Sequence, residues 1–210
     1  MNRFWITFLA FCVLFAAQID LQAGTKASKQ LVITDCHYTL DSALRGTKAP
    51  KEILDSITLL DVVYFGFDSK LHRGQILVNK EVAEDVKFLF ELMRKERFPI
   101  KSTIPIVAFD WDDDKSMEAN NTSSFNYRKV AGKNTPSNHS WGRAIDINPF
   151  TNPAVYKSGK ISPKGAKYIK SAKGAINGKS KILLEMKKRG WEWGGVWTSL
   201  KDYQHIQKLR

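Results

Sequence analysis

Cysteine is nearly absent from this chain of 210 residues, which contains only Cys12 and Cys36. Cys12 lies in the apolar N-terminal segment, so removal of that segment would leave Cys36 alone and exclude an internal disulfide. The fold must then be held together by its hydrophobic core or by a bound metal. Long apolar runs are equally scarce, because no segment after the N-terminal one has the length and hydrophobicity of a membrane span.

Residues 1–23 have the order of a secretory signal peptide. Arg3 precedes an apolar run from Phe4 to Ala17, and the residues 21–23 (LQA) form a suitable cleavage site. An uncleaved membrane anchor is the alternative interpretation. We expect a secreted or periplasmic protein without stable membrane insertion after cleavage, in which residues 24–58 extend the main domain at its N-terminal side.

The chain is strongly basic, with 33 lysines and arginines against 21 acidic residues and a net charge of +12. Such a charge favours an anionic partner, which can be nucleic acid, a membrane surface or an acidic polymer such as a bacterial cell wall. Export argues against nucleic acid. Lysines recur every three residues within the exposed segment 157–181, which a solvated face explains better than a dedicated wall-binding patch. Nothing in the sequence indicates an oligomeric state.

Strand and helix patterns alternate irregularly and predict a compact α+β domain. The predicted strands are 29–38, 59–65, 76–78, 104–109 and 144–147. The predicted helices are 80–98, with Asn79 as N-cap, and 180–189, with Gly190 after the end. A turn is expected around Arg73-Gly74, and loops at the acidic stretch 111–116, at 122–136 and at 157–181.

His139 and Asp146 are the first candidates for chemistry, because Gly142 between them allows a sharp turn that returns Asp146 toward His139. Zinc accepts imidazole nitrogen and carboxylate oxygen, and its catalytic sites keep three protein ligands. By itself the pair is a weak signal, because a polar loop that enters a buried strand gives this pattern more often than a metal site does. His205 is a candidate third ligand, and Asp202 is a carboxylate three residues away from it.

Taken together, these motifs resemble the D-alanyl-D-alanine carboxypeptidase family of zinc peptidases, including its VanY-like and L-alanyl-D-glutamate endopeptidase members. The pattern runs S-x-H-x-x-G-x-A-x-D from Ser137 to Asp146, then GWxWGGxW from Gly190 to Trp197, and finally D-x-x-H from Asp202 to His205. Similarity extends from about Leu59, so we expect a catalytic domain over residues 59–207. The resemblance implies a small single domain with a central antiparallel sheet flanked by helices.

The resemblance also implies roles for individual residues. One zinc ion per chain would be held by His139, Asp146 and His205, with Asp202 as general base. Arg128 would steady the substrate carbonyl and the charge that develops on it. Around these groups, Ser137 is expected to orient the site through hydrogen bonds, and Trp193 and Trp197 to pack beneath His205 or wall the cleft.

Two functions follow from different classes. The first is a zinc peptidase that hydrolyses peptidoglycan stem peptides, either as a D-Ala-D-Ala carboxypeptidase or as an L-Ala-D-Glu endopeptidase. The second is a catalytically silent module that keeps the fold and binds the cell wall or another polyanion. Intact Asp202 and Arg128 favour the peptidase, because binding alone needs no base beside a metal. The sequence does not settle which peptide bond is cleaved.

Overall fold

Three small sheets organise the computed structural model, which describes residues 31–210. The signal peptide predicted for residues 1–23 lies outside the described residues. The strands are β1 Val32–Thr34, β2 Ile57–Phe65, β3 Leu71–Asn79, β4 Ala144–Asp146, β5 Ala154–Tyr156, β6 Ile161–Ser162, β7 Glu192–Trp193, β8 Leu200–Asp202 and β9 His205–Gln207. The α-helices are α1 Leu40–Ala43, α2 Lys51–Leu54, α3 Ala83–Lys95, α4 Asp113–Glu118 and α5 Lys181–Lys188.

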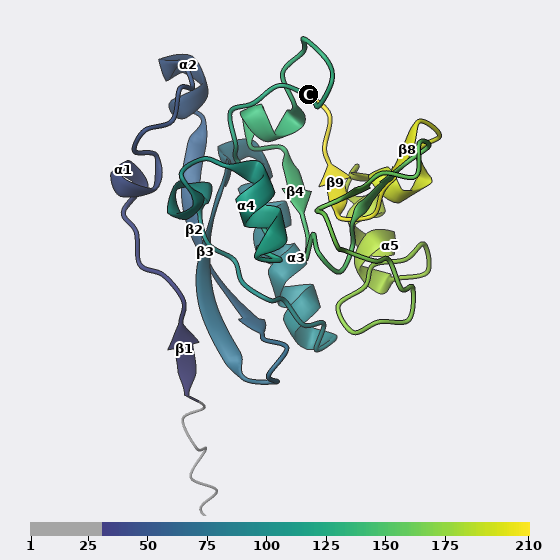
Figure 1. Cartoon of the computed structure of the whole chain (residues 1–210). Helices are drawn as coiled ribbons and strands as arrows, with labels where there is room; N and C mark the ends of the chain where they lie inside the picture. The colour runs from purple at the N-terminus through teal and green to yellow at the C-terminus, as the bar shows by residue number, and fades with distance from the viewer. Residues whose placement is uncertain (1–30) are drawn as a thin grey trace, which may run out of the picture.

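The sheets have the orders β1-β3-β2, β4-β9-β7 and β6-β5-β8. All their strand pairs are antiparallel except β1 with β3, so the predicted α+β class with antiparallel pairing is confirmed, distributed over three sheets. Figure 1 shows the long strands β2 and β3 on one side of the molecule and α5 with β8 on the other, with β4 and β9 between them. No helix among residues 31–210 has the length and apolar character needed to cross a membrane.

The main core forms where α3 packs against β2 and β3. Residues of β2 alternate in burial, and Leu60, Val62 and Tyr64 face the same cluster as Val86, Leu89, Phe90 and Met93 of α3. Ile145 and Ile147 near β4, Ile206 of β9 and Trp191 belong to the same cluster. The ends of β4 and β9 are therefore held on a rigid, close-packed base.

The start of the α3 region confirms the predicted cap. The side chain of Asn79 accepts a hydrogen bond of 3.0 Å from the backbone N–H of Glu81, and a 3-10 turn over Lys80–Val82 leads into α3. The helix ends at Lys95, earlier than the predicted Phe98, and Arg97 then adopts a positive φ of 51°. The predicted helix 180–189 is likewise confirmed as α5, although the Ser180 hydroxyl accepts from the Asn177 N–H and caps no helical N–H.

The predicted turn at Arg73-Gly74 is wrong. Both residues lie inside β3, where they pair with Val63 and Val62 of β2. Glycine is needed here for a different reason, because a Cβ on Gly74 would overlap the carbonyl oxygen of Thr103. A glycine that admits a neighbouring backbone gives the same sequence signal as a glycine that turns the chain.

Two more local predictions are corrected around residue 105. The segment 104–109 is not a strand, because Pro105 starts a 3-10 helix over Ile106–Phe109 and its carbonyl accepts from the N–H of Ala108 at 3.0 Å. The acidic stretch expected as a loop contains α4. Asp112 caps it by accepting from the backbone N–H of Lys115 at 3.1 Å, and the acidic residues that follow lie at the positive end of the helix dipole.

Gly142 is restricted both by its backbone conformation and by its neighbours. Its φ is +63°, and an added Cβ would lie 2.6 Å from the backbone nitrogen of Asn79 and 2.9 Å from Ile57 Cδ1. Gly142→Ala is expected to lower the free energy of unfolding by about 2 kcal/mol or more, since left-handed strain and steric overlap add. Gly159→Ala is the matched control, because Gly159 also has a positive φ (+82°) but open space around it. Equal losses for the two variants in urea unfolding would show that the overlap at Gly142 has no effect.

Candidate metal centre and catalytic cavity

The register between β4 and β9 brings two distant parts of the chain together. Asp146 lies directly opposite His205 in this antiparallel pair, so both side chains project from the same face of the second sheet. His139 comes from the 3-10 turn Asn138–Trp141 just before β4, and Gly142 ends that turn with its N–H donating to the His139 carbonyl at 3.0 Å. All three side chains are buried, with exposed fractions of 2% to 6%.

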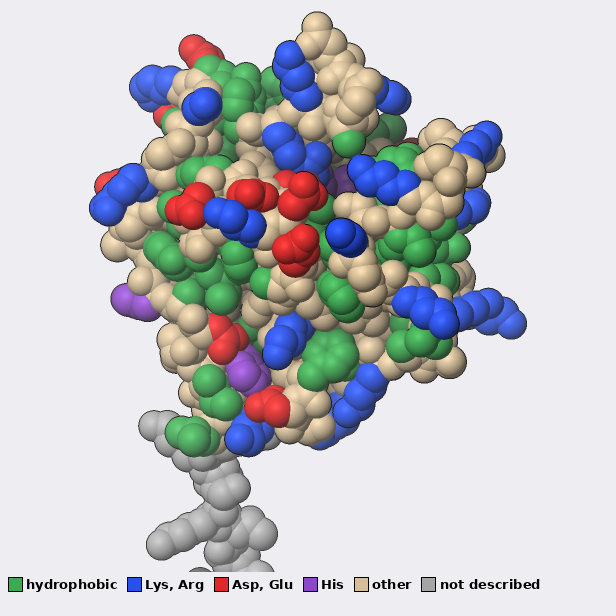
Figure 2. Space-filling view, viewed as in Figure 1, with side chains coloured by type: hydrophobic (Ala, Val, Ile, Leu, Met, Phe, Trp, Pro, Cys, Tyr) green, Lys and Arg blue, Asp and Glu red, His purple; other side chains and the backbone are tan. Residues whose placement is uncertain are grey.

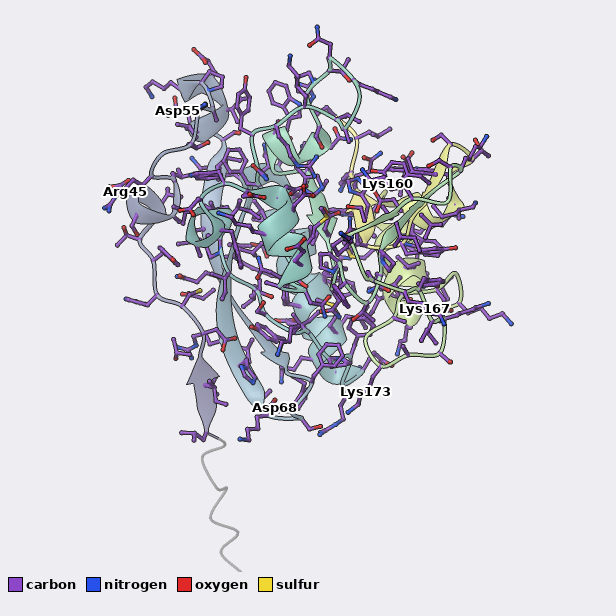
Figure 3. The ribbon with its side chains drawn as sticks, viewed as in Figure 1. Arg45, Asp55, Asp68, Lys160, Lys167 and Lys173 are labelled. Carbon is purple, nitrogen blue, oxygen red and sulfur yellow. The ribbon has the colours of Figure 1, made fainter. Side chains whose placement is uncertain are left out.

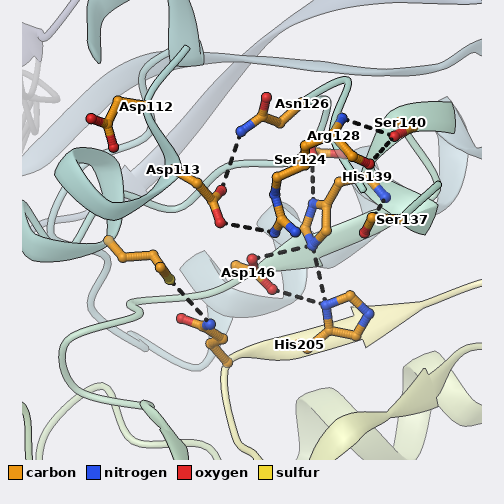
Figure 4. Close-up of polar contacts among 12 residues, drawn as sticks. Asp112, Asp113, Ser124, Asn126, Arg128, Ser137, His139, Ser140, Asp146 and His205 are labelled. Carbon is orange, nitrogen blue, oxygen red and sulfur yellow. Dashed lines mark hydrogen bonds and ion pairs between the residues drawn. The ribbon is translucent and has the colours of Figure 1, made fainter. Parts of the chain in front are cut away.

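The three side chains converge on one point. His139 Nε2 lies 3.1 Å from an Asp146 carboxylate oxygen and 3.2 Å from His205 Nδ1, and His205 Nδ1 lies 3.0 Å from the other Asp146 oxygen (Figure 4). Among the described residues these form the one cluster of three or more His, Cys, Asp and Glu side chains with the spacing for a metal ion. The structure therefore brings together the three residues predicted from the sequence as ligands.

Backbone and side-chain acceptors fix which nitrogen of each ring faces the cluster. The Nδ1 of His139 lies 2.6 Å from the carbonyl of Ser124, so Nδ1–H donates there and Nε2 presents its lone pair inward. The Nε2 of His205 lies 3.0 Å from the side-chain carbonyl of Gln207, which leaves Nδ1 free in the same way. Once both rings are neutral, two nitrogen lone pairs and a carboxylate face one another, an arrangement that a central cation stabilises.

Gln207 was missed by the sequence predictions. Its side-chain carbonyl also accepts from Asn138 Nδ2 at 2.7 Å, which ties β9 to the turn that carries His139. A usable signal existed, because residues two apart on a strand share a face and Gln207 follows His205 by two. In β9, Gln207 lies two residues after His205 and fixes the tautomer of the His205 ring.

The pKa values reflect this mutual dependence. Burial raises the pKa of Asp146. The charges of His139 and His205 and their hydrogen bonds lower this pKa by more than burial raises it, so the net shift is strongly downward. Burial lowers the pKa of His205, and the hydrogen bond and charge of Asp146 more than offset this and raise it to about 9. The buried carboxylate is thus kept ionised and needs positive charge beside it.

Asp202 lies at the end of β8 and lines the same cavity as the three convergent side chains. Its Oδ1 atom is buried and has no hydrogen-bond partner within residues 31–210. Burial raises the pKa of Asp202 to about 6, the largest effect, and the negative charge of Asp146 adds to it. A buried carboxylate with a raised pKa and a free oxygen has the properties of a general base near neutral pH.

Arg128 also lines the cavity, and its guanidinium is held by a carboxylate that the sequence predictions did not single out. Arg128 Nη2 lies 2.9 Å from Asp113, whose other oxygen accepts from Asn126 Nδ2 at 3.2 Å (Figure 4). The buried Nε of Arg128 has no partner in the described part of the chain. The sequence predictions missed Asp113 because it begins α4, in a segment that was expected to be a loop. The ion pair fixes the direction of Arg128 and compensates its charge.

The serines near the site act on the backbone. Ser137 Oγ accepts from the N–H of His139 at 3.3 Å and so starts the turn that carries this ring. Ser140 Oγ bonds both the carbonyl and the N–H of Arg128, at 2.6 and 3.0 Å, so the same turn holds the Arg128 segment. The 137–141 turn therefore positions a candidate ligand and the arginine together.

The two candidate tryptophans have different places. The Trp197 ring lies 5.2 Å from the His205 ring, centroid to centroid, and lines the cavity. Trp193 is not among the residues that line this cavity; its Nε1 donates to the carbonyl of Tyr203 at 2.9 Å and its ring packs on the main core. Trp197 thus both supports His205 and forms a wall, while Trp193 supports the fold.

These side chains surround a cavity of about 390 Å³. Its lining includes Arg128, the turn of His139, Asp202, and Tyr156 and Lys160 of the β5–β6 hairpin. A volume of this size suits a few amino-acid residues of a substrate and not a large folded partner.

The segment that carries the three convergent side chains also matches a known protein family. Residues 131–208 match the family model of the D-alanyl-D-alanine carboxypeptidases. The matched segment includes the three convergent residues and Asp202, while Arg128 lies just before it. No solved structure matches the chain. The match confirms the family resemblance of the motifs and supports a peptidase of the metal-dependent type.

The residues present fit a zinc ion. Two imidazole nitrogens with fixed tautomers and one carboxylate form the three-ligand set typical of catalytic zinc, and the facing lone pairs leave room for a charge at their centre. Each ligand is itself hydrogen-bonded or paired, as metal ligands require. His139, Asp146 and His205 could thus hold a metal ion next to a cavity lined by a free carboxylate.

Proposed function

We infer that the protein is a secreted or periplasmic zinc peptidase that hydrolyses peptide bonds in peptidoglycan stem peptides. One observation carries this proposal: a buried carboxylate oxygen of Asp202, without a hydrogen-bond partner among residues 31–210, belongs to a side chain that lines the same cavity as three convergent metal-ligating side chains. A module that only binds a wall would gain nothing from this costly arrangement, because burying an unpaired carboxylate destabilises the fold.

The mechanism follows from the positions of the side chains. A zinc ion held by His139, Asp146 and His205 would supply Lewis acidity, lowering the pKa of a water molecule and polarising the substrate carbonyl. Asp202 would accept the proton of the attacking water and pass it to the nitrogen of the leaving amine. Arg128, directed by Asp113, would donate hydrogen bonds to the carbonyl oxygen as negative charge develops on it.

The experiment is digestion of purified peptidoglycan by protein loaded with zinc, with the products read by mass spectrometry. Removal of zinc by a chelator is expected to stop hydrolysis, and addition of zinc is expected to restore hydrolysis, because the three ligands alone supply no Lewis acid. Loss of a terminal alanine would identify a carboxypeptidase, and new internal amino termini an endopeptidase. Bound zinc without any product would instead favour the silent wall-binding module.

A further inference from the structure

The β5–β6 hairpin places a lysine at the mouth of the catalytic cavity. Its turn runs over residues 157–159, and the N–H of Gly159, which has a φ of +82°, donates to the carbonyl of Tyr156 at 2.9 Å. The N–H of Tyr156 donates to the carbonyl of Lys160 at 2.9 Å and closes the hairpin. Lys160 Nζ then lies 5.7 Å from the centre of the Tyr156 ring. Lys160 is therefore presented by an ordered turn, and Figure 3 shows it at the inner end of the hairpin, toward the body of the protein.

The two cationic side chains that line the cavity differ in whether they are already paired. Arg128 and Lys160 are the two cationic residues among those that line it, and Arg128 is already paired with Asp113. Lys160 makes no ion pair with any residue in 31–210. Asp113 and Asp114 at the start of α4 also line the cavity, and Figure 2 shows acidic side chains gathered over this helix. Lys160 is thus a cavity-lining cation whose charge is left for a small anion to pair with.

The strand pairing places the hairpin of Lys160 next to Asp202. Ala154 of β5 lies opposite Asp202 of β8, and Tyr156 shares the face of Ala154 because it is two residues further along β5. Burial and then the charge of Asp202 raise the pKa of Tyr156, which agrees with a phenol that faces the same space. The hairpin thus lies on the side of Asp202, the group that passes a proton to the leaving amine under the proposed function.

We propose that Lys160, presented beside the Tyr156 ring, binds a free carboxylate on the residue that contains the leaving amine. The inference rests on the proposed function and adds the chemical feature that selects the bond. Two stem-peptide bonds offer this carboxylate: a C-terminal D-alanine carries it after the scissile bond, and a D-glutamate linked through its side chain keeps its α-carboxylate there. A charge-assisted hydrogen bond of this kind is worth about ten- to hundredfold in kcat/KM.

The test compares zinc-loaded wild type and Lys160→Met on two pairs of synthetic peptides. One pair ends in D-Ala-D-Ala with a free or an amidated C-terminus, and the other contains L-Ala-D-Glu with a free or an amidated α-carboxylate. Wild type is expected to prefer the free acid of the pair it cleaves by about tenfold or more, and Lys160→Met to lose this preference through a higher KM with little change in kcat. The pair that is cleaved identifies the source of the carboxylate.

Two further variants separate charge from structure. Lys157→Met changes an exposed lysine in the same hairpin turn that does not line the cavity, and it is expected to keep the preference of wild type. Lys160→Arg is expected to keep it as well. An unchanged preference in Lys160→Met, or equal cleavage of acid and amide by wild type, would overturn the inference and leave the proposed function standing. No cleavage of any peptide by wild type would overturn both.

Discussion

Replacing His139 with alanine is expected to abolish stoichiometric zinc binding and, with it, all measurable hydrolysis. The variant removes one of three convergent ligands and leaves the Ser124 carbonyl, which accepts from the ring, without its partner. Loss of a residue that only supports a ligand commonly costs 10- to 100-fold in metal affinity, so loss of the ligand itself should cost more than about 100-fold. Zinc content after dialysis against a weak chelator, measured by mass spectrometry, checks this directly.

His37→Ala is the matched control for this experiment, because His37 is exposed and does not belong to the cluster. It is expected to keep one zinc ion per chain and full activity. Should His139→Ala retain one tightly bound zinc, the assignment of the ligands from geometry would be wrong. Far-UV circular dichroism on both variants separates loss of the metal from loss of the fold.

Asp202→Asn should give the opposite combination, with zinc retained and catalysis lost. The change keeps the size of the side chain but removes the basic oxygen that lines the cavity. General-base catalysis contributes about 10²- to 10⁴-fold, so kcat is expected to fall within that range while zinc content stays at one per chain. Asp202→Glu is the conservative control, since it keeps a carboxylate at this position. Retention by Asp202→Asn of more than a tenth of the wild-type kcat would place the base elsewhere.

The same variant makes a prediction about stability. Burial raises the pKa of Asp202 to about 6 in the folded state, above the value of about 3.9 for an unfolded aspartate. The unfolded chain therefore loses this proton first as pH rises, and the folded state loses stability between these two values. In zinc-free protein at pH 8, Asp202→Asn is expected to melt at the same temperature as wild type or higher, measured by calorimetry. A lower melting temperature would mean that the carboxylate stabilises the fold.

The sequence was sufficient for the elements that repeat a simple period. The core strand 59–65 and the helix after Asn79 follow from apolar spacing and a capping side chain, and both are present. It was insufficient where several causes give the same local signal. Gly74 serves a close backbone approach, Pro105 starts a 3-10 turn within an apolar run, and Asp112 caps a helix within what read as an acidic loop.

The candidate site shows a similar division. His139 and Asp146 could be paired from their spacing around Gly142, with His205 and Asp202 as further candidates, and the resemblance added Arg128 and the role of each residue. The residues that hold these groups could not be found, because their contacts depend on tertiary placement. Asp113 meets Arg128 only because α4 begins beside it, and Gln207 acts only through the register of β9 against β4. The sequence did not distinguish Lys160 from the other lysines, because only the fold of the β5–β6 hairpin places it at the cavity.

The pairing of β4 with β9 joins two residues that lie far apart in the sequence. Asp146 and His205 are neighbours in the sheet, yet the chain between them builds β5, β6, β8 and the Trp197 wall of the cavity. Insertions or replacements within this excursion can reshape the cavity without moving either end, provided that both strands stay paired in register. Selection, or an engineer, can thus exchange the 156–160 hairpin for a new one and change which peptides are recognised while the two opposed side chains keep their places.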